Sequence, residues 1–428
     1  MAETVSPVSP INNQQSTIRN PDASSIRNPH SAIRTPDASA IRNQPSAIRN
    51  RDGFLHIRVA GDPYEMGLQH GELLREEIRG LVDAVYRHVL YGQPGAVGWG
   101  IRRGARVIAR LMAIRVPSDH REELRGISHA AGVSYRDLLL VNCFDDVLAN
   151  LRTLAMRLGR FGCSAFARNA APAAKDELWC GRNLDYFVPS AAGDEVWAAT
   201  DFMKRHVVAI EHQPKGKAGF LSVGWPGFIG VATGLSEHAL ALAALVVMAP
   251  SSRPLGTPAT SLYRRIMEEA TSLEGAVAIL RSARRTQGHN VLLASGDERT
   301  AAVVEYTPPR LEIRWPASGW IATTNHFNHP EMVRRHGSCA FLSSTERLAR
   351  LGELYSRDGS DSAEVGSLAP VLLDTALRSQ EADEYCTVLN PFTIYSTLFA
   401  PAQRRMWVRT ADRPDRTFEE VAFGPAGL

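Results

Sequence analysis

The strongest constraint on the fold is a change of sequence pattern about a third of the way along the chain. Residues 62–158 carry apolar side chains at helical spacing, and we expect a layer of helices there. From residue 163 onward the pattern changes to short apolar runs broken by Gly, Pro and Asp, among them WAATDFM at 197–203, which predict strands. Further helices are expected at 261–284 and 343–357. The alternation predicts an α+β fold, with sheets flanked by helices on both outer faces.

The N-terminal segment is expected to lie outside the folded domain. Residues 12–50 form a degenerate repeat with isoleucines seven or eight residues apart, at Ile18, Ile26, Ile33, Ile41 and Ile48. Prolines within the repeat remove helical N–H groups, which argues against a coiled coil. Residues 1–52 are therefore predicted to be a disordered, mildly basic tail, with a docking arm for a partner protein as the alternative. One domain is expected over 53–428, mainly helical over 53–162 and strand-rich over 163–428.

Charge and composition exclude several classes of partner. The formal charge of +3, from 48 basic and 45 acidic residues, gives no basic excess that would favour nucleic acid or a membrane surface. The first twenty residues lack the features of a secretory signal, and no apolar run reaches the roughly 18 residues that span a bilayer. Five scattered cysteines do not form a disulfide framework, and no metal-ligand motif occurs among the thirteen histidines. We therefore expect a reduced, cytoplasmic protein without a metal or cofactor.

The cysteine that opens the strand-rich part is the first candidate for chemistry. Cys163 begins the run CSAFARN, and the run LWCGRNLDY follows across an eight-residue loop, so the two can pair as a hairpin. A symmetric loop places Cys163 opposite Leu184, with Arg182 and Asp185 near the same end of the sheet. A cysteine at the start of an apolar strand is otherwise a structural residue. An Arg and an Asp three residues apart are likewise often a simple ion pair.

The neighbours of this cysteine suit a nucleophile at a chain terminus. If the peptide bond between Gly162 and Cys163 breaks, the new α-amine has a reference pKa near 8 and can accept the thiol proton. Asp185 could hold the resulting ammonium, and Arg182 would favour the thiolate. Gly162 removes a Cβ from the path of attack on its carbonyl, which an N→S acyl shift requires in a strained, uncrowded peptide.

Several segments together resemble a known family. The segments are GDPYEMGLQHGELLREEI, EELRGISHAAGVSYRDLLLVN, GCSAF, GRNLDY, EYTP and TTNHF, in this order over residues 55–350. They are similar to the self-cleaving acyltransferases and hydrolases related to isopenicillin N acyltransferase (acyl-CoA:6-aminopenicillanic acid acyltransferase). That family belongs to the N-terminal-nucleophile (Ntn) hydrolases, together with choloylglycine hydrolases and acid ceramidase.

The resemblance implies a fold and a set of roles. The fold is an αββα sandwich of two antiparallel sheets between helical layers. Cys163 matches the nucleophile, Arg182 and Asp185 match its supporting pair, and Asn325 of TTNHF matches an amide that helps to hold the oxyanion. Arg347 matches a second family arginine, for which a surface helix residue is the alternative. The cut between Gly162 and Cys163 would leave the N-terminal fragment bound as a heterodimer.

One segment departs from the family pattern. Relatives often carry an Asn near the substrate carbonyl where this chain reads TGLSEHAL, which places Ser236 at that position. Asn290 is a substitute donor, although it also reads as a strand-entry residue. For the substrate pocket the candidates are Trp225, Phe228 and His326, with core packing as the alternative for the two aromatic residues.

Three functions remain open from the sequence. The first is hydrolysis of the C–N amide bond of a small N-acyl substrate through a thioester on Cys163. The second is acyl transfer to an amine in specialised metabolism, with an acyl-CoA as a candidate co-substrate. A third is an unprocessed, inactive binding or scaffold protein.

Overall fold

The computed structural model describes residues 47–49, 55–85, 95–150, 160–169, 178–187, 198–357 and 364–424. The chain divides into two units, Met1–Gln44 and Pro45–Leu428, and every described residue belongs to the second. Of the predicted tail, only Ala47–Arg49 is described, as a short strand (β1) that pairs with Leu55–Ile57. The rest of the tail lies outside the described residues.

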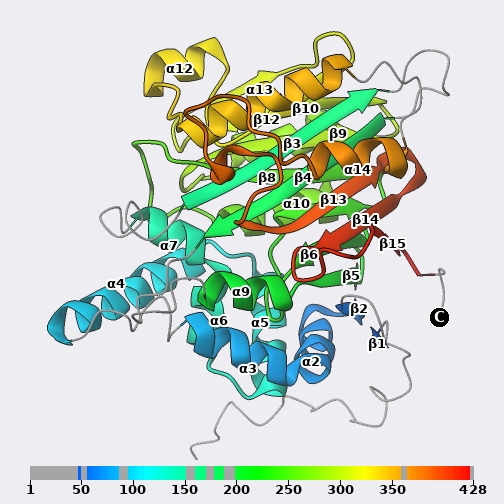
Figure 1. The fold of residues 1–428 in the computed structure, drawn as a ribbon. Coiled ribbons are helices and arrows are strands. Elements are labelled where there is room, and N and C mark those ends of the chain that lie inside the picture. The colour runs from blue at the N-terminus through cyan, green and yellow to red at the C-terminus, as the bar shows by residue number, and fades with distance from the viewer. Residues whose placement is uncertain are drawn as a thin grey trace, which may run out of the picture. The chain divides into compact units, whose positions relative to one another are not determined.

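Two sheets form the centre of the second unit (Figure 1). In order across the larger sheet, the strands are β1, β2 (Leu55–Gly61), β5 (Val208–Pro214), β6 (Phe220–Gly224), β7 (Thr233–Ser236), β8 (Leu240–Val247), β9 (Gly288–Ser295), β10 (Thr300–Tyr306) and β11 (Leu311–Arg314). The smaller sheet contains β12 (Trp320–Thr323), β3 (Arg160–Asn169), β4 (Leu178–Phe187), β13 (Thr393–Ala400), β14 (Arg405–Thr410) and β15 (Glu419–Ala422). Neighbouring strands are antiparallel except β2 and β5, which run parallel.

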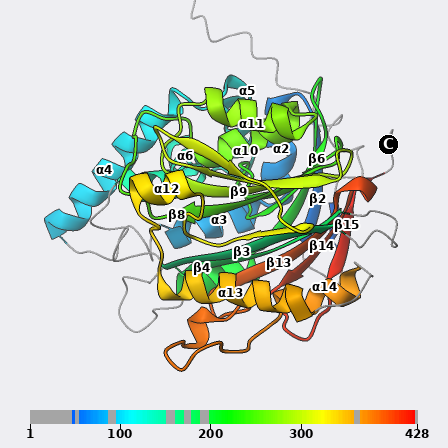
Figure 2. The same cartoon turned by 90° about the horizontal axis from the view of Figure 1, so that it is seen from above.

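Helices cover both outer faces of the sheet pair, as Figure 2 shows. The outer face of the larger sheet carries α10 (Ala259–Glu269) and α11 (Leu273–Ser282), and that of the smaller sheet carries α13 (Leu342–Arg357) and α14 (Val365–Leu372). Between the sheets, apolar side chains such as Leu221 and Leu292 pack against those of β3, β4 and β13. The predicted αββα sandwich is confirmed, with the parallel β2–β5 pair as its one departure from purely antiparallel sheets.

The N-terminal helices pack on the β2–β5 end of the larger sheet. They are α2 (Pro63–Leu73), α3 (Arg75–Ala84), α4 (Gly95–Ala113), α5 (Ser118–Ala131), α6 (Tyr135–Asn142) and α7 (Phe144–Asn150). Helices α2 and α5 cross at backbone contact, because a Cβ added at Gly67 would lie 2.1 Å from the Glu123 carbonyl oxygen, and one at Gly126 would lie 2.3 Å from that of Tyr64. Gly67 and Gly126 are thus required by the packing of these two helices.

One predicted strand is a helix. The segment WAATDFM contributes to α9 (Ala198–Arg205) instead of a strand. Helical spacing brings the rings of Phe202 and His206, four residues apart, into a stack with centroids 3.9 Å apart.

Three short elements complete the description: α12 (Pro330–His336), η2 (Glu384–Cys386) and η3 (Pro401–Gln403).

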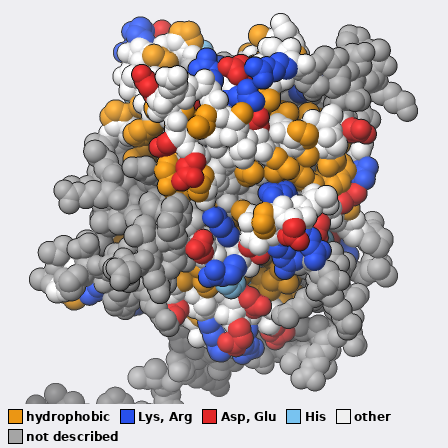
Figure 3. Space-filling model, in the orientation of Figure 1, with side chains coloured by type: hydrophobic (Ala, Val, Ile, Leu, Met, Phe, Trp, Pro, Cys, Tyr) orange, Lys and Arg blue, Asp and Glu red, His pale blue; other side chains and the backbone are white. Residues whose placement is uncertain are grey.

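The described surface carries both signs of charge. Basic and acidic side chains are interspersed over the described part of the face in Figure 3, in agreement with the near balance of charge in the sequence. Across the parts of the chain that the structure describes, no helix combines the length and apolar character needed to cross a membrane.

Candidate active site

The predicted hairpin of β3 and β4 forms in the predicted register. Cys163 lies directly opposite Leu184, and Ala165 lies opposite Arg182. Directly opposed residues of an antiparallel pair share a face, and successive residues alternate between faces. Cys163, Arg182 and Leu184 therefore face the space between the sheets, which we call the inner face of the hairpin. Gly162, Ser164 and Asp185 lie on its outer face, toward α13.

On the inner face, the thiol of Cys163 lies beside a buried guanidinium. Arg182, which is 0% exposed, donates from Nη2 to Cys163 Sγ at 3.3 Å. Its Nη1 donates to the Ala232 carbonyl at 2.8 Å and to Thr233 Oγ1 at 2.5 Å. The guanidinium carbon also lies 5.8 Å from the centroid of the Tyr395 ring. Because these contacts come from three separate parts of the chain, at β3, at the start of β7 and in β13, Arg182 is held in one orientation against the sulfur.

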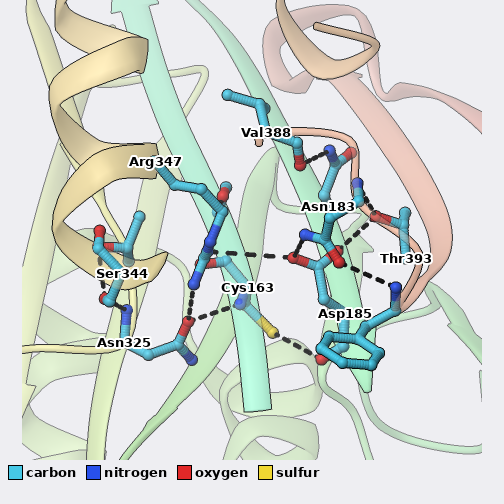
Figure 4. A network of polar contacts seen from close by, with 12 residues as sticks. Cys163, Asn183, Asp185, Asn325, Ser344, Arg347, Val388 and Thr393 are labelled. Carbon is cyan, nitrogen blue, oxygen red and sulfur yellow. Dashed lines mark hydrogen bonds and ion pairs between the residues drawn. The ribbon is translucent and has the colours of Figure 1, made fainter. Parts of the chain in front are cut away.

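On the outer face, the carboxylate of Asp185 is enclosed by donors (Figure 4). Thr393 Oγ1 donates to Asp185 Oδ1 at 2.7 Å, and Asn390 Nδ2 donates to Oδ2 at 2.8 Å. Arg347 Nη1 lies 4.0 Å from Oδ2, and both side chains of this ion pair are buried. Arg182 and Asp185 thus flank Cys163 from opposite faces of the hairpin.

Asn325 and Arg347 hold the backbone of Cys163 (Figure 4). The Cys163 amide donates to Asn325 Oδ1 at 2.6 Å, and Arg347 Nη2 donates to the same oxygen at 3.1 Å. Arg347 Nη1 donates to the Cys163 carbonyl at 2.5 Å and to Ser164 Oγ at 3.0 Å. In the intact chain the nitrogen of Cys163 therefore contacts Asn325, whereas the sequence predicted Asp185 as its partner after cleavage.

Burial governs the protonation of the two acidic groups at this site. It raises the pKa of the Cys163 thiol above its ordinary value, and the Arg182 cation opposes that rise. Burial also raises the pKa of Asp185, against the opposing effect of Arg347 and of the donors Thr393 and Asn390. A buried thiol with a raised pKa is protonated at neutral pH, so a nucleophilic role needs a base close to the sulfur.

Gly162 is constrained by space and not by backbone conformation. A Cβ at this position would lie 3.2 Å from Asp185 Oδ2 and 3.4 Å from Arg347 Nη2. Its φ is outside the left-handed region that favours glycine. The strained peptide expected from the sequence stays a prediction, and the absence of a Cβ at Gly162 lets the strand approach the ion pair.

Ser236 and Asn290, the two candidate donors to the oxyanion, both lie away from the thiol. Thr233 meets Arg182, so Ser236, three residues later in β7, lies on the opposite face, where its hydroxyl accepts from the Leu240 amide at 3.4 Å. Asn290 braces the turn that carries Asn325, because its Nδ2 donates to the carbonyls of Thr324 and His326 at 2.9 and 2.7 Å. The structure therefore separates Ser236 from the thiol and gives Asn290 a supporting place.

His326 is part of this turn and not of a pocket wall. Its Nδ1 lies 2.8 Å from Ser344 Oγ and 3.1 Å from Thr324 Oγ1. Burial lowers the pKa of His326 to about 4, with a contribution from the Arg347 cation. The side chain is thus neutral at physiological pH and helps to fix the turn.

A large pocket adjoins the inner face of the hairpin. It encloses about 890 Å³ of empty space, including its opening to solvent. Its lining comes from both sequence halves: Leu81, Ala84, Val85, Val141, Asn142, Phe144, Asp145 and Asp146 before Cys163, and Leu184, Tyr186, Phe202, Met203, Trp225, Phe228, Ala232 and Thr260 after it. Trp225 and Phe228 lie in the wall, as the sequence predicted, whereas His326 does not.

Several residues of the site were not found from the sequence. Thr233 and Tyr395 join Arg182 on the inner face, where the Tyr395 hydroxyl lies 2.9 Å from Thr233 Oγ1. Asn390, Thr393 and Ser344 complete the outer face. The run NPFTIY, which places an amide and a hydroxyl before an apolar strand, is the one signal that pointed to two of them.

Solved structures of amidases and acylases align with part of the chain. A Caenorhabditis elegans ortholog of N-acylethanolamine-hydrolyzing acid amidase covers 60% of this chain and 100% of its own, at 14% identity and a TM-score of 0.40. A conjugated bile acid hydrolase from Clostridium perfringens covers 61% of this chain and 92% of its own, at 13% identity and a TM-score of 0.41.

Curated relatives share more sequence. An uncharacterized protein of Archaeoglobus fulgidus is 27% identical over 279 residues, 60% of this chain and 44% of the relative. Protein dcd1A of Dictyostelium discoideum is 26% identical over 275 residues, 59% of this chain and 58% of the relative. Acid ceramidase of Rattus norvegicus is 23% identical over 129 residues, 30% of this chain and 29% of the relative. The chain spans about half the length of the first two relatives.

A family model also matches the chain. It covers residues 173–415, which include Arg182, Asp185, Asn325 and Arg347 but begin after Cys163. Because this match extends over more than half of the chain, the protein belongs to the acyl-coenzyme A:6-aminopenicillanic acid acyl-transferase family.

Proposed function

We propose that the protein cleaves itself between Gly162 and Cys163 and then hydrolyses the C–N amide bond of an N-acyl substrate, with Cys163 as the nucleophile. The observation that carries this proposal is the pairing of two contacts at one residue. The sulfur lies 3.3 Å from Arg182 Nη2, while the nitrogen lies 2.6 Å from Asn325 Oδ1. Thiol and future amine are thus each provided with a polar partner.

The proposed self-cleavage is an N→S acyl shift followed by hydrolysis. The thiol sulfur attacks the Gly162 carbonyl carbon, its proton passes to the Cys163 nitrogen, and the C–N bond breaks to leave a thioester and a free α-amine. Water then hydrolyses the thioester to the Gly162 carboxylic acid and the Cys163 thiol. The ion pair of Asp185 and Arg347, with the donors Thr393 and Asn390, would hold the strand in place during these steps.

In the proposed turnover, the α-amine of Cys163 takes the proton from the thiol. The thiolate attacks the substrate carbonyl, and the developing oxyanion needs neutral or cationic donors. Asn325 Nδ2 donates one hydrogen to the Val246 carbonyl at 2.9 Å, which leaves its second hydrogen for this oxyanion. The amine leaves with the proton, and water releases the acid from the thioester.

Acyl transfer is the second candidate function, and the description of the matched family favours it. An amine would replace water in the last step, and an acyl-CoA thioester could replace the amide as donor. Incubation of an N-acyl substrate with and without added amines separates the two functions, because transfer yields an acylated amine and hydrolysis yields only free acid.

Intact mass measurement of the purified protein tests the proposal. Wild-type protein is expected to give two fragments, residues 1–162 and 163–428, which co-elute as a heterodimer in gel filtration. Cys163→Ala is expected to stay whole and to lose amidase activity. Cys180→Ala is the matched control, because Cys180, like Cys163, is a buried cysteine on the inner face of the hairpin, but it lies in β4 opposite Ala167.

A wild-type chain that remains whole and inactive would reject the enzyme and leave the binding or scaffold function. Cleavage that persists in Cys163→Ala would reject Cys163 as the nucleophile. Loss of cleavage in Cys180→Ala would show that the assay reports packing of the hairpin and not chemistry.

A further inference from the structure

The pocket beside Cys163 has an unusual balance of charge. Two of its lining residues, Asp145 and Asp146, are acidic, and no Lys, Arg or His is among its described lining residues. Carboxylates are rarely buried beside apolar side chains unless a partner compensates for their lost hydration. The partners of the two carboxylates therefore indicate what the pocket is built to receive.

The carboxylate of Asp146 is hydrogen-bonded within the protein. Its carboxylate is 1% exposed and accepts hydrogen bonds from the Thr286 hydroxyl and from the Ala259 amide, at 3.2 Å for the amide. These bonds tie α7 to the start of α10 and to the segment before β9. Asp146 is thus a structural residue of the pocket wall.

Asp145 differs from its neighbour because only one of its two carboxylate oxygens has a hydrogen-bond partner among the residues that the structure describes. Tyr186 donates to Asp145 Oδ1 at 2.6 Å, and Oδ2 makes no hydrogen bond with any described residue. Burial raises the pKa of Asp145, which is the expected behaviour of a carboxylate that lacks a compensating cation. One oxygen in the wall of the pocket is therefore available to a donor from a bound molecule.

The remaining walls suit a cation on an apolar arm. Five aromatic side chains line the pocket: Phe144, Tyr186, Phe202, Trp225 and Phe228. Trp225 and Phe228 meet edge to face with centroids 5.9 Å apart. Aromatic faces attract ammonium groups, and an adjacent carboxylate strengthens that attraction in a dry site.

The pocket is connected to the candidate nucleophile through two residues. Leu184 lines the pocket and lies directly opposite Cys163 in the hairpin. Ala232 lines it as well, and its carbonyl accepts from Arg182 Nη1. A substrate whose carbonyl reaches Cys163 can therefore extend one arm into this pocket.

We propose that Asp145 is a specificity-determining residue that selects substrates carrying an ammonium group at the end of an apolar arm. The proposal rests on the proposed function for its connection to catalysis. A purely apolar arm would leave Asp145 Oδ2 buried without a donor, whereas an ammonium would supply both a hydrogen bond and the missing charge. The arm belongs either to the acyl group or to the amine of the substrate, and the two are separable by experiment.

The first test measures binding without catalysis. In the Cys163→Ala background, calorimetry compares hexylammonium with 1-hexanol, which have the same apolar arm. Hexylammonium is expected to bind at least about tenfold more tightly, and Asp145→Asn is expected to remove that ratio. Asp201→Asn is the control, since this α9 side chain is acidic but 46% exposed. Equal affinities, or a ratio that survives Asp145→Asn, would overturn the proposal.

The second test uses the wild-type protein and does not depend on the folding of a variant. The acyl arm is probed by kcat/KM for 6-aminohexanoyl anilide against heptanoyl anilide. N-acetyl-hexanediamine against N-acetylheptylamine probes the amine arm. A preference for the ammonium of about tenfold or more in either pair supports the proposal and assigns the arm. Turnover without a preference in either pair overturns it, while absence of all turnover with retained ammonium binding counts against the proposed function alone.

Discussion

The two faces of the β3–β4 hairpin surround the same cysteine with different chemistry. The inner face offers the sulfur one cation, Arg182, and an aromatic pocket. The outer face carries an ion pair, Asp185 and Arg347, and each oxygen of the Asp185 carboxylate accepts one side-chain hydrogen bond. Under the proposed function, the inner face would activate the thiol and receive the substrate, whereas the outer face would fix the strand. The predictions below test whether the two faces are separable.

The largest effect on stability is expected from the outer face. Asp185→Asn leaves the buried Arg347 guanidinium without its anion, which should lower the free energy of unfolding by about 3–5 kcal/mol. Urea denaturation of the variant against wild type measures this loss. The double variant Asp185→Asn/Arg347→Met should recover part of it, because no charge is then left unpaired. A single variant as stable as wild type would show that the ion pair does not hold the outer face.

Asp146, in the wall of the pocket beside the inner face, should make the free energy of unfolding depend on pH. Burial raises its pKa from 3.8 to about 7. The folded protein therefore keeps a proton that the unfolded chain loses near pH 4, and the contribution of Asp146 to stability should fall as pH rises from about 4 to about 7. Above that window the contribution is constant.

Asp146→Asn is expected to flatten this part of the profile by a few kcal/mol, which thermal melting across the window measures. The amide oxygen of the variant can still accept from the Ala259 amide, so the comparison isolates the charge. If the two profiles are parallel, Asp146 does not titrate in this window.

The effects of Arg182 and Arg347 on the pKa of the Cys163 thiol allow the two faces to be compared. Loss of a cation beside a thiolate raises the thiol pKa, so Arg182→Met should move the pH dependence of Cys163 alkylation upward by about one unit or more. Arg347→Met, on the other face, should move it less. Mass spectrometry of iodoacetamide labelling against pH measures both shifts. Equal shifts would contradict a division between the faces.

A matched pair of threonines gives the smallest effect. Thr393→Val removes one of the two side-chain hydrogen-bond donors of the Asp185 carboxylate, whereas Thr233→Val leaves Arg182 Nη1 with the Ala232 carbonyl. Thr393→Val should therefore lower the free energy of unfolding by about 1 kcal/mol more than Thr233→Val. Urea denaturation of both variants checks the difference, and the reverse order would place the tighter polar network on the inner face.

The sequence predicted those features that depend on residues close together along the chain. The pairing of Cys163 with Leu184 follows from the length of one loop, and the layers follow from the alternation of helical and strand patterns. The donors to Asp185 on the outer face could not be predicted in this way, because Thr393 and Asn390 lie more than 200 residues away from it along the chain. The sequence also did not show which residues of the short strand β7 face the thiol. Thr233 contacts Arg182, so Ser236 lies on the other face of the strand.

The position of β2 has a consequence for any attempt to produce the segment from Cys163 onward by itself. This strand covers one edge of β5, and it precedes the proposed cut. Without it, β5 would present a row of unpaired amides and carbonyls, and such an open edge recruits strands from other molecules. A polypeptide that starts at Cys163 should therefore aggregate unless residues 55–150 are supplied in trans, so solubility on co-expression would report whether the two pieces reassemble.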